Sequence, residues 1–176
     1  MNKNFPYYIL IALLFLLFKY IFTLTGTDDL SFLLKPTNAL VSFATGSYSV
    51  YLPGSGYYHE KLNVIIDKSC SGYNFWLLCF VMLAFLGLKH FYKPIQKIIL
   101  IPSTLIISYL LTILVNASRI FVSVVLHNPF NYFSSSDTYL ILHQSVGIIT
   151  NLVFLIIIYL LAEKILNKKT DNEKFT

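Results

Sequence analysis

Three residues of this chain could together carry out nucleophilic chemistry on an acyl group. Cys70 offers a thiol whose thiolate is a strong nucleophile, and a cationic neighbour lowers the pKa of such a thiol. His143 could remove the thiol proton and later return it to a leaving amine. Arg119 could stabilise the oxyanion of a tetrahedral intermediate. The three residue types therefore predict acyl transfer, meaning peptide cleavage or transpeptidation.

Two of the three also have a simpler interpretation. Cys70 could be an inert buried thiol or a lipidation site, and Arg119 could be a cation at a membrane interface. However, Arg119 is the only arginine of the chain, against twelve lysines, and an arginine near a membrane indicates function by default. His59 or His127 could replace His143 as the base. The histidines show no paired metal-ligand spacing, so we expect no metal and no cofactor.

The composition shows which kind of structure must hold these residues. Of the 176 residues, 56% are hydrophobic and only 12% are charged, and the mean hydropathy is +0.68. A soluble domain carries roughly 25% charged residues, so an ordinary soluble globule is excluded. The net charge of +5 is too diluted by apolar sequence for a nucleic-acid partner. We therefore predict an all-α integral membrane protein, a single polytopic domain whose partner is the lipid bilayer.

Four apolar runs are long enough to cross a bilayer. They are predicted at about 7–25, 72–88, 98–118 (or on to 126) and 138–162. The first run contains Lys19, which the sequence does not explain. No small-x-small cleavage site follows this run, so we interpret it as an uncleaved anchor rather than a signal peptide. A further apolar stretch at 30–44 is split by Pro36 and is predicted to be interfacial or re-entrant.

The distribution of lysines predicts the orientation. If the N-terminus is cytoplasmic, eight lysines lie inside and four basic residues lie outside, as the positive-inside rule requires. This places both termini in the cytoplasm, with a tail at 163–176 and an external loop at 26–69. Within that loop, Ser47–Leu52 and Tyr57–Ile66 flank the turn sequence Pro53-Gly54-Ser55-Gly56, which predicts a small β-hairpin. We expect a multi-pass protein of the cytoplasmic (inner) membrane.

The helices are predicted to bring the three residues to one level. Measured at 1.5 Å per residue from lysines at the inner ends of their spans, Cys70, Arg119 and His143 each lie about 28–33 Å away. This is the outer edge of a hydrocarbon core about 30 Å thick. Cys79 falls within the same span as Cys70, too far along it for a disulfide.

Polar residues at helical spacing should face other helices rather than lipid. Cys70 and Asn74 are four residues apart, as are His143, Gly147 and Asn151, which predicts shared faces in the second and fourth spans. The third span carries a polar stripe made of Ser108, Thr112, Asn116, Arg119 and Ser123.

These residues resemble a known family. Ser69-Cys70-Ser71-Gly72 opens a span, Asn116-Ala117-Ser118-Arg119-Ile120 lies at the outer end of another, and His143 comes early in the last. In order, spacing and membrane context they resemble the exosortase/archaeosortase family, and within it a compact member of the exosortase K type. The resemblance covers roughly Val64 to Tyr159, and each element is short. Many members have about eight spans, whereas this chain offers four.

The resemblance implies a membrane-embedded cysteine protease/transpeptidase. Its catalytic set would be Cys70, Arg119 and His143, and its supporting residues are expected to be Ser71, Gly72, Asn74 and Asn116. Such an enzyme cleaves exported surface proteins that end in a short motif, a transmembrane helix and a basic cluster. It cuts at the motif, outside the membrane, and passes the new carboxyl end to an anchor. The alternative is a non-enzymatic bundle, such as a transporter subunit or assembly partner, whose polar stripe forms a helix–helix interface.

Overall fold

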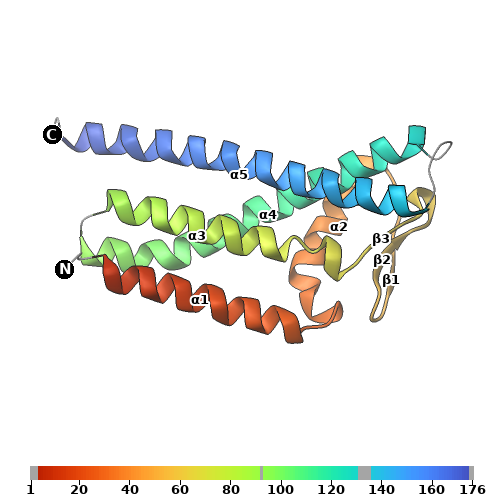
Figure 1. The fold of residues 1–176 in the computed structure, drawn as a ribbon, viewed down its shortest axis with the longest axis horizontal. Helices are drawn as coiled ribbons and strands as arrows, with labels where there is room; N and C mark the ends of the chain where they lie inside the picture. Colours follow the sequence, from red (N-terminus) through yellow and green to blue (C-terminus); the bar gives the residue numbers. More distant parts are fainter. Residues whose placement is uncertain (1–3, 92, 131–135, 175–176) are drawn as a thin grey trace. The chain divides into compact units, whose positions relative to one another are not determined.

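The computed structural model describes the backbone of residues 4–91, 93–130 and 136–174 (Figure 1). It describes their side chains except those of residues 126–130, 136–144, 146 and 169–174. Helices, 3-10 turns and short strands follow in this order: α1 (Phe5–Leu24), η1 (Asp28–Leu30), α2 (Ser31–Thr45), β1 (Val50–Leu52), β2 (Gly56–His59), η2 (Glu60–Leu62), β3 (Val64–Ile66), η3 (Lys68–Cys70), α3 (Tyr73–His90), α4 (Pro94–Phe130) and α5 (Ser136–Lys174).

Four helical stretches are long and apolar enough to cross a membrane: Phe5–Leu24, Lys68–His90, Pro94–Val125 and Gly147–Lys168. The predicted set of four apolar helices is confirmed. The tail predicted at 163–176 is helical as far as Lys174, because α5 continues without a break to that residue. After Gly147 the sequence contains no glycine or proline, the residues that end helices, so nothing stops α5 at the end of its apolar part.

The contacts group the chain into two compact units. The first unit comprises Met1–Leu24, Asn74–Leu111 and Phe154–Thr176, and the second comprises Thr25–Tyr73 and Thr112–Val153. Both α4 and α5 contribute to each unit. The sequence predicts one polytopic domain, and the two units are the compact parts within it.

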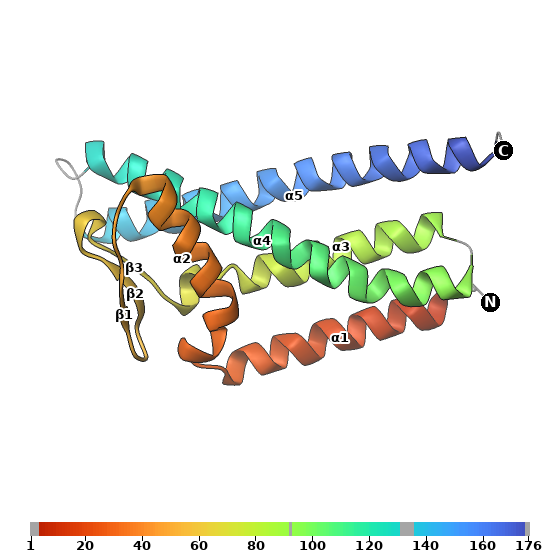
Figure 2. The same ribbon diagram turned by 180° about the vertical axis from the view of Figure 1, so that it is seen from behind.

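The first unit is held by apolar packing. Figures 1 and 2 show α1, α3 and the first part of α4 side by side. Its buried core consists of Ile11, Phe80, Ala84, Leu88 and Leu100.

Lys19, which the sequence left unexplained, donates from Nζ to Asn74 Oδ1 at 2.6 Å within this first unit. The bond gives an ammonium on an apolar helix a polar partner.

The second unit contains α2 and a small sheet. The stretch predicted to be interfacial or re-entrant is a helix, α2, which buries Leu33, Leu34 and Val41 on one side and ends at Gly46 with φ +61°. Left-handed backbone after a helix is a common C-cap, and glycine adopts it without a Cβ clash.

The segment predicted to form a hairpin is a three-stranded antiparallel sheet in the order β1-β2-β3. The predicted second run, Tyr57–Ile66, is two strands, because η2 and Asn63 at φ 50° reverse the chain in its middle. Gly56, predicted as part of the turn, is the first residue of β2 and pairs with Leu52 of β1. The prediction of a single hairpin is therefore corrected.

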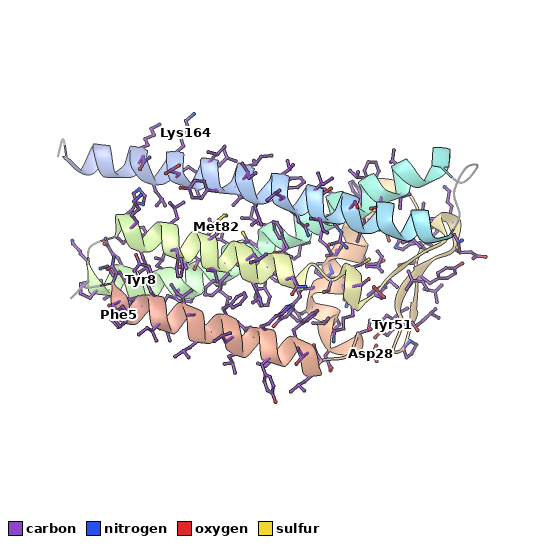
Figure 3. The ribbon with its side chains drawn as sticks, viewed as in Figure 1. Phe5, Tyr8, Asp28, Tyr51, Met82 and Lys164 are labelled. Atoms are coloured by element: carbon purple, nitrogen blue, oxygen red, sulfur yellow. The ribbon has the colours of Figure 1, made fainter. Side chains whose placement is uncertain are left out.

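The tip of this sheet is tied to η1, the turn just before α2, by one carboxylate. Tyr51 Oη and the Gly54 amide donate to Asp28 Oδ1 at 2.5 and 2.9 Å. Figure 3 shows Asp28 and Tyr51 lying close to each other. The hydrogen bond from Tyr51, followed by that from Gly54, holds the pKa of Asp28 below its ordinary value.

Candidate functional site

Cys70 lies in a short 3-10 turn that an aspartate caps. Asp67 Oδ1 accepts hydrogen bonds from the Ser69 amide at 2.9 Å, the Ser69 hydroxyl at 2.6 Å and the Cys70 amide at 3.3 Å. Capping by an aspartate satisfies amide groups that a helical turn leaves without partners. The Cys70 side chain is 6% exposed, and Ser69 Oγ lies 3.8 Å from its sulfur. Sequence reasoning missed Asp67, although an aspartate directly before a helical turn is a capping signal.

Gly72 joins this turn to α3. Its φ is +72°, in the left-handed region that favours glycine. Ser71 Oγ accepts from the Tyr73 amide at 3.3 Å and so caps the first turn of α3. Because Cys70 lies before this break, it is not part of α3. The prediction that Cys70 and Asn74 share a helix face is therefore wrong.

Two side chains of α4 hold the carbonyl groups of the turn. Asn116 Nδ2 donates to Cys70 O, and Arg119 Nη2 lies 3.5 Å from Ser69 O. The two residues are three apart and therefore share a face of α4. A Cβ on Gly72 would lie 3.0 Å from both Asn116 Cγ and Thr112 Cγ2, so glycine also permits this close approach. The structure thus brings together Cys70, Ser71, Gly72, Asn116 and Arg119.

The α5 helix passes close to Arg119. A Cβ built on Gly147 would lie 3.6 Å from Arg119 Cδ and Nε, an ordinary van der Waals contact, so this part of α5 lies directly beside the Arg119 side chain. His143 lies in α5 four residues before Gly147. Its side chain lies outside the described residues, as does that of His127.

His59 is excluded as the base by its own partners. It is fully buried, its Nδ1 lies 2.8 Å from Ser47 Oγ, and its Nε2 lies 2.8 Å from Asn38 Oδ1. Ser47 Oγ is in turn 2.7 Å from Thr45 Oγ1. We call this set, His59 with Asn38, Thr45 and Ser47, the His59 cluster; it comes from α2, the loop after α2, and β2. Burial lowers the pKa of His59, which disfavours its charged form. A ring engaged on both nitrogens has no atom left for the Cys70 proton.

The first three residues of the polar stripe predicted on α4 are buried, and its last two, Arg119 and Ser123, are half-buried. Ser108, Thr112 and Asn116 are each 3% exposed or less. Among the described side chains, Asn116 Oδ1 and Ser123 Oγ are buried and have no hydrogen-bond partner. The opposite face of α4 is apolar and borders a cavity of about 350 Å³ against α2, lined by Leu40, Phe43, Leu114, Ala117 and Phe121 among others.

Both cysteines are free, which confirms that Cys70 and Cys79 do not form a disulfide. Within the described part of the chain, no three His, Cys, Asp or Glu side chains gather closely enough to hold a metal ion.

No protein-family model, curated protein or solved structure matches the chain significantly.

Proposed function

We propose that the chain is a membrane-embedded cysteine protease/transpeptidase of the exosortase type. One observation supports this most strongly: Asn116 and Arg119 of α4 hold the carbonyl groups of Cys70 and Ser69, the turn that carries the thiol. These are the residues on which the sequence resemblance rests. The site would face outward from the cytoplasmic membrane, with both termini inside, as the lysine distribution predicts.

In the proposed reaction, the Cys70 sulfur attacks the carbonyl carbon of the scissile peptide bond. The thiol proton passes to His143, and a tetrahedral oxyanion forms. The carbon–nitrogen bond then breaks, His143 returns the proton to the leaving amine, and a thioester remains on Cys70. An amine of the acceptor, or water, displaces the thiol and releases the acyl group.

The surroundings of Arg119 suit the role of oxyanion donor. Its hydrogen bond to Ser69 O is long, at 3.5 Å, and the described residues give its guanidinium no other hydrogen bond. With respect to the described part of the chain, several N–H groups therefore remain to bind the oxyanion. Hydrogen bonds in a resting site are often long and shorten when the substrate is bound. His143 fits the role of base because it shares the α5 face with Gly147, which lies against Arg119.

The substrates would be exported proteins that end in a short motif, a transmembrane helix and a basic cluster. A thiol at the outer edge of the bilayer suits them, because a helix anchored in the same membrane presents the residues just outside it. The bilayer thereby raises the effective concentration of the motif at the site.

The test compares cells that carry Cys70→Ala with cells that carry Cys79→Ala. The second cysteine is fully buried within α3 and serves as the matched control. We expect Cys70→Ala to leave C-terminal sorting signals uncleaved, and Cys79→Ala to process them. The C-termini of exported membrane proteins are mapped by mass spectrometry. Normal processing in the Cys70→Ala cell would refute the proposal.

A non-enzymatic bundle is the second candidate, and the low exposure of Cys70 favours it. In that case the buried side chains of the stripe would serve only as a helix–helix interface. Labelling with a membrane-impermeant maleimide separates the two. An enzyme must open its thiol to external reagents, whereas a structural thiol resists the label and tolerates alanine.

A further inference from the structure

Two buried polar atoms on one face of α4 have no hydrogen-bond partner in the described part of the chain. Of the three buried side-chain atoms without a hydrogen bond among the described residues, Thr37 Oγ1 lies in α2, and Asn116 Oδ1 and Ser123 Oγ lie on α4. Leaving a buried polar atom unpaired is destabilising, so such atoms call for an explanation. Ser123 is notable because helical serines commonly bond a carbonyl one turn back, as Ser118 does with Leu114 O at 2.9 Å.

The spacing of the two atoms defines what could bind them. Residues 116 and 123 are seven apart, two helical turns, and therefore lie on one face about 10 Å apart along the axis. Arg119 lies between them on the same face. A ligand that pairs with both atoms must carry polar groups about 10 Å apart on one of its sides.

An extended peptide meets that requirement. A strand rises about 3.3 Å per residue, so three residues span about 10 Å. In such a strand the N–H of the first residue and the C=O of the third point to the same side. Asn116 Oδ1 can accept from the N–H, and the Ser123 hydroxyl can donate to the C=O.

We propose that the polar face of α4 from Asn116 to Ser123 binds three residues of the substrate backbone in extended form, beside Cys70. This rests on the proposed function and deepens it, because it assigns a peptide subsite that reads backbone rather than side chains. Water could pair with each atom singly, but only a peptide links both to a position next to the thiol.

The subsite is closed in the resting protein. Both polar atoms are shielded from solvent, and α5 lies at Gly147 against Arg119, between them along α4. The peptide therefore enters when this part of α5 moves aside, and its backbone then supplies the missing partners.

The test measures how fast Cys70 is alkylated by two reagents of equal intrinsic reactivity. Acetyl-trialanine chloromethyl ketone carries the three-residue backbone, and acetyl-alanine chloromethyl ketone does not. The full chain in detergent micelles is used, and the Cys70-containing fragment is quantified by mass spectrometry. Since one hydrogen bond is worth up to about tenfold in binding, we expect the longer reagent to react about tenfold faster.

Ser123→Ala and Ser118→Ala form a matched pair. Ser118 lies on the opposite face, at the apolar cavity, and its hydroxyl is already bonded. Ser123→Ala should reduce the rate ratio to about threefold or less, and Ser118→Ala should preserve it. N-methylation of the first alanine of the longer reagent should remove the advantage as well.

Three results would each overturn the proposed subsite. They are equal alkylation rates for the two reagents, no alkylation by the longer reagent, and equal effects of Ser123→Ala and Ser118→Ala on the rate ratio. If signals are still cleaved in a Cys70-dependent way, the proposed enzyme survives that result. Normal processing in Cys70→Ala cells would instead remove the enzyme, whatever the rate ratio.

Discussion

The second unit contains two buried polar sites that are built differently. In the His59 cluster both ring nitrogens have partners at 2.8 Å, and the chain of hydrogen bonds continues to Thr45. At the Cys70 turn, Asn116 Oδ1 has no partner among the described residues, and Arg119 has one long hydrogen bond.

The difference indicates what each site is for. A fully paired buried network fixes one arrangement and rigidifies it. A site that keeps unpaired donors and acceptors is less stable by itself, and such atoms concentrate where a ligand completes the bonding. We therefore expect changes in the His59 cluster to lower stability, and changes at the Cys70 turn to lower activity.

The largest effect is expected from Arg119→Lys. Lysine keeps the charge but loses the planar fork of donors, and removal of one oxyanion donor costs roughly 10²–10³ in rate. Because Arg119 makes one long hydrogen bond, thermal unfolding should shift little. Processing is measured alongside thermal unfolding in micelles, with Ser118→Ala as the control. If Arg119→Lys unfolds the protein, Arg119 serves stability, which contradicts the expected difference between the Cys70 turn and the His59 cluster.

The next effect is a loss of stability in His59→Ala. Asn38 Oδ1 would lose its partner, at a cost of roughly 1–3 kcal/mol, and Ser47 Oγ would keep only its contact with Thr45 Oγ1. His90→Ala is the matched control, since its ring also has two partners, Leu86 O and Asn167, but is only half-buried. Amide exchange across β2 reports the loss. Equal exchange in the two variants would mean that the His59 cluster does not stabilise the sheet.

A smaller difference is expected between Gly72→Ala and Gly46→Ala. Both glycines have positive φ, at +72° and +61°, so both substitutions carry a similar backbone cost. Only at Gly72 would the new Cβ press on α4, at 3.0 Å from Asn116 Cγ, whereas Gly46 has open space. We expect Gly72→Ala to cost about 1–3 kcal/mol more, from overpacking, and to impair processing. Equal unfolding temperatures for Gly72→Ala and Gly46→Ala would contradict this, since they would show that α4 shifts to accommodate the new Cβ without loss of stability.

The smallest effect concerns pH at the sheet tip. The folded pKa of Asp28 is lowered, so its stabilisation is present above the ordinary value of about 3.9 and is lost as pH falls through the folded pKa. The pKa of Tyr51 is raised, chiefly by its hydrogen bond to Asp28, so its contribution is lost as pH rises above about 10. Once intrinsic exchange rates are subtracted, protection of the Gly54 amide should therefore fall at both extremes.

Asp28→Asn should abolish the loss of Gly54 amide protection at low pH. Asp29→Asn is the control, because Asp29 bonds the Gly26 amide instead of the tip. If protection of the Gly54 amide still falls at low pH in Asp28→Asn, a group other than Asp28 causes that loss.

The sequence predicted the parts of the fold that depend on composition and length. Apolar runs of about 20 residues are enough to locate membrane-length helices, whatever the helices pack against. The sequence also predicted that Asn116 and Arg119 share a face, because residues three apart on a helix lie side by side. In the structure this shared face contacts the Cys70 turn.

Other features depend on single backbone angles that spacing does not reveal. Because Gly72 has a positive φ, Cys70 does not lie on the α3 face that it was predicted to share with Asn74. Asn63, which also has a positive φ, divides one predicted strand into two. The partner of Lys19 lies 55 residues away, and the cap formed by Asp67 depends on a turn only three residues long. Such features emerge from tertiary structure.

The burial of Cys70 bears on how the protein would meet oxidants. The chain has two cysteines, both free, and Cys79 is fully buried in α3. A sulfenic acid on Cys70 would thus lack an accessible resolving thiol in its own chain and would advance to the irreversible sulfinic acid. With only 6% of its surface exposed, the resting thiol is shielded from peroxide. In the proposed enzyme, oxidative inactivation should therefore require the open state, so that molecules engaged with substrate would be damaged faster than idle ones.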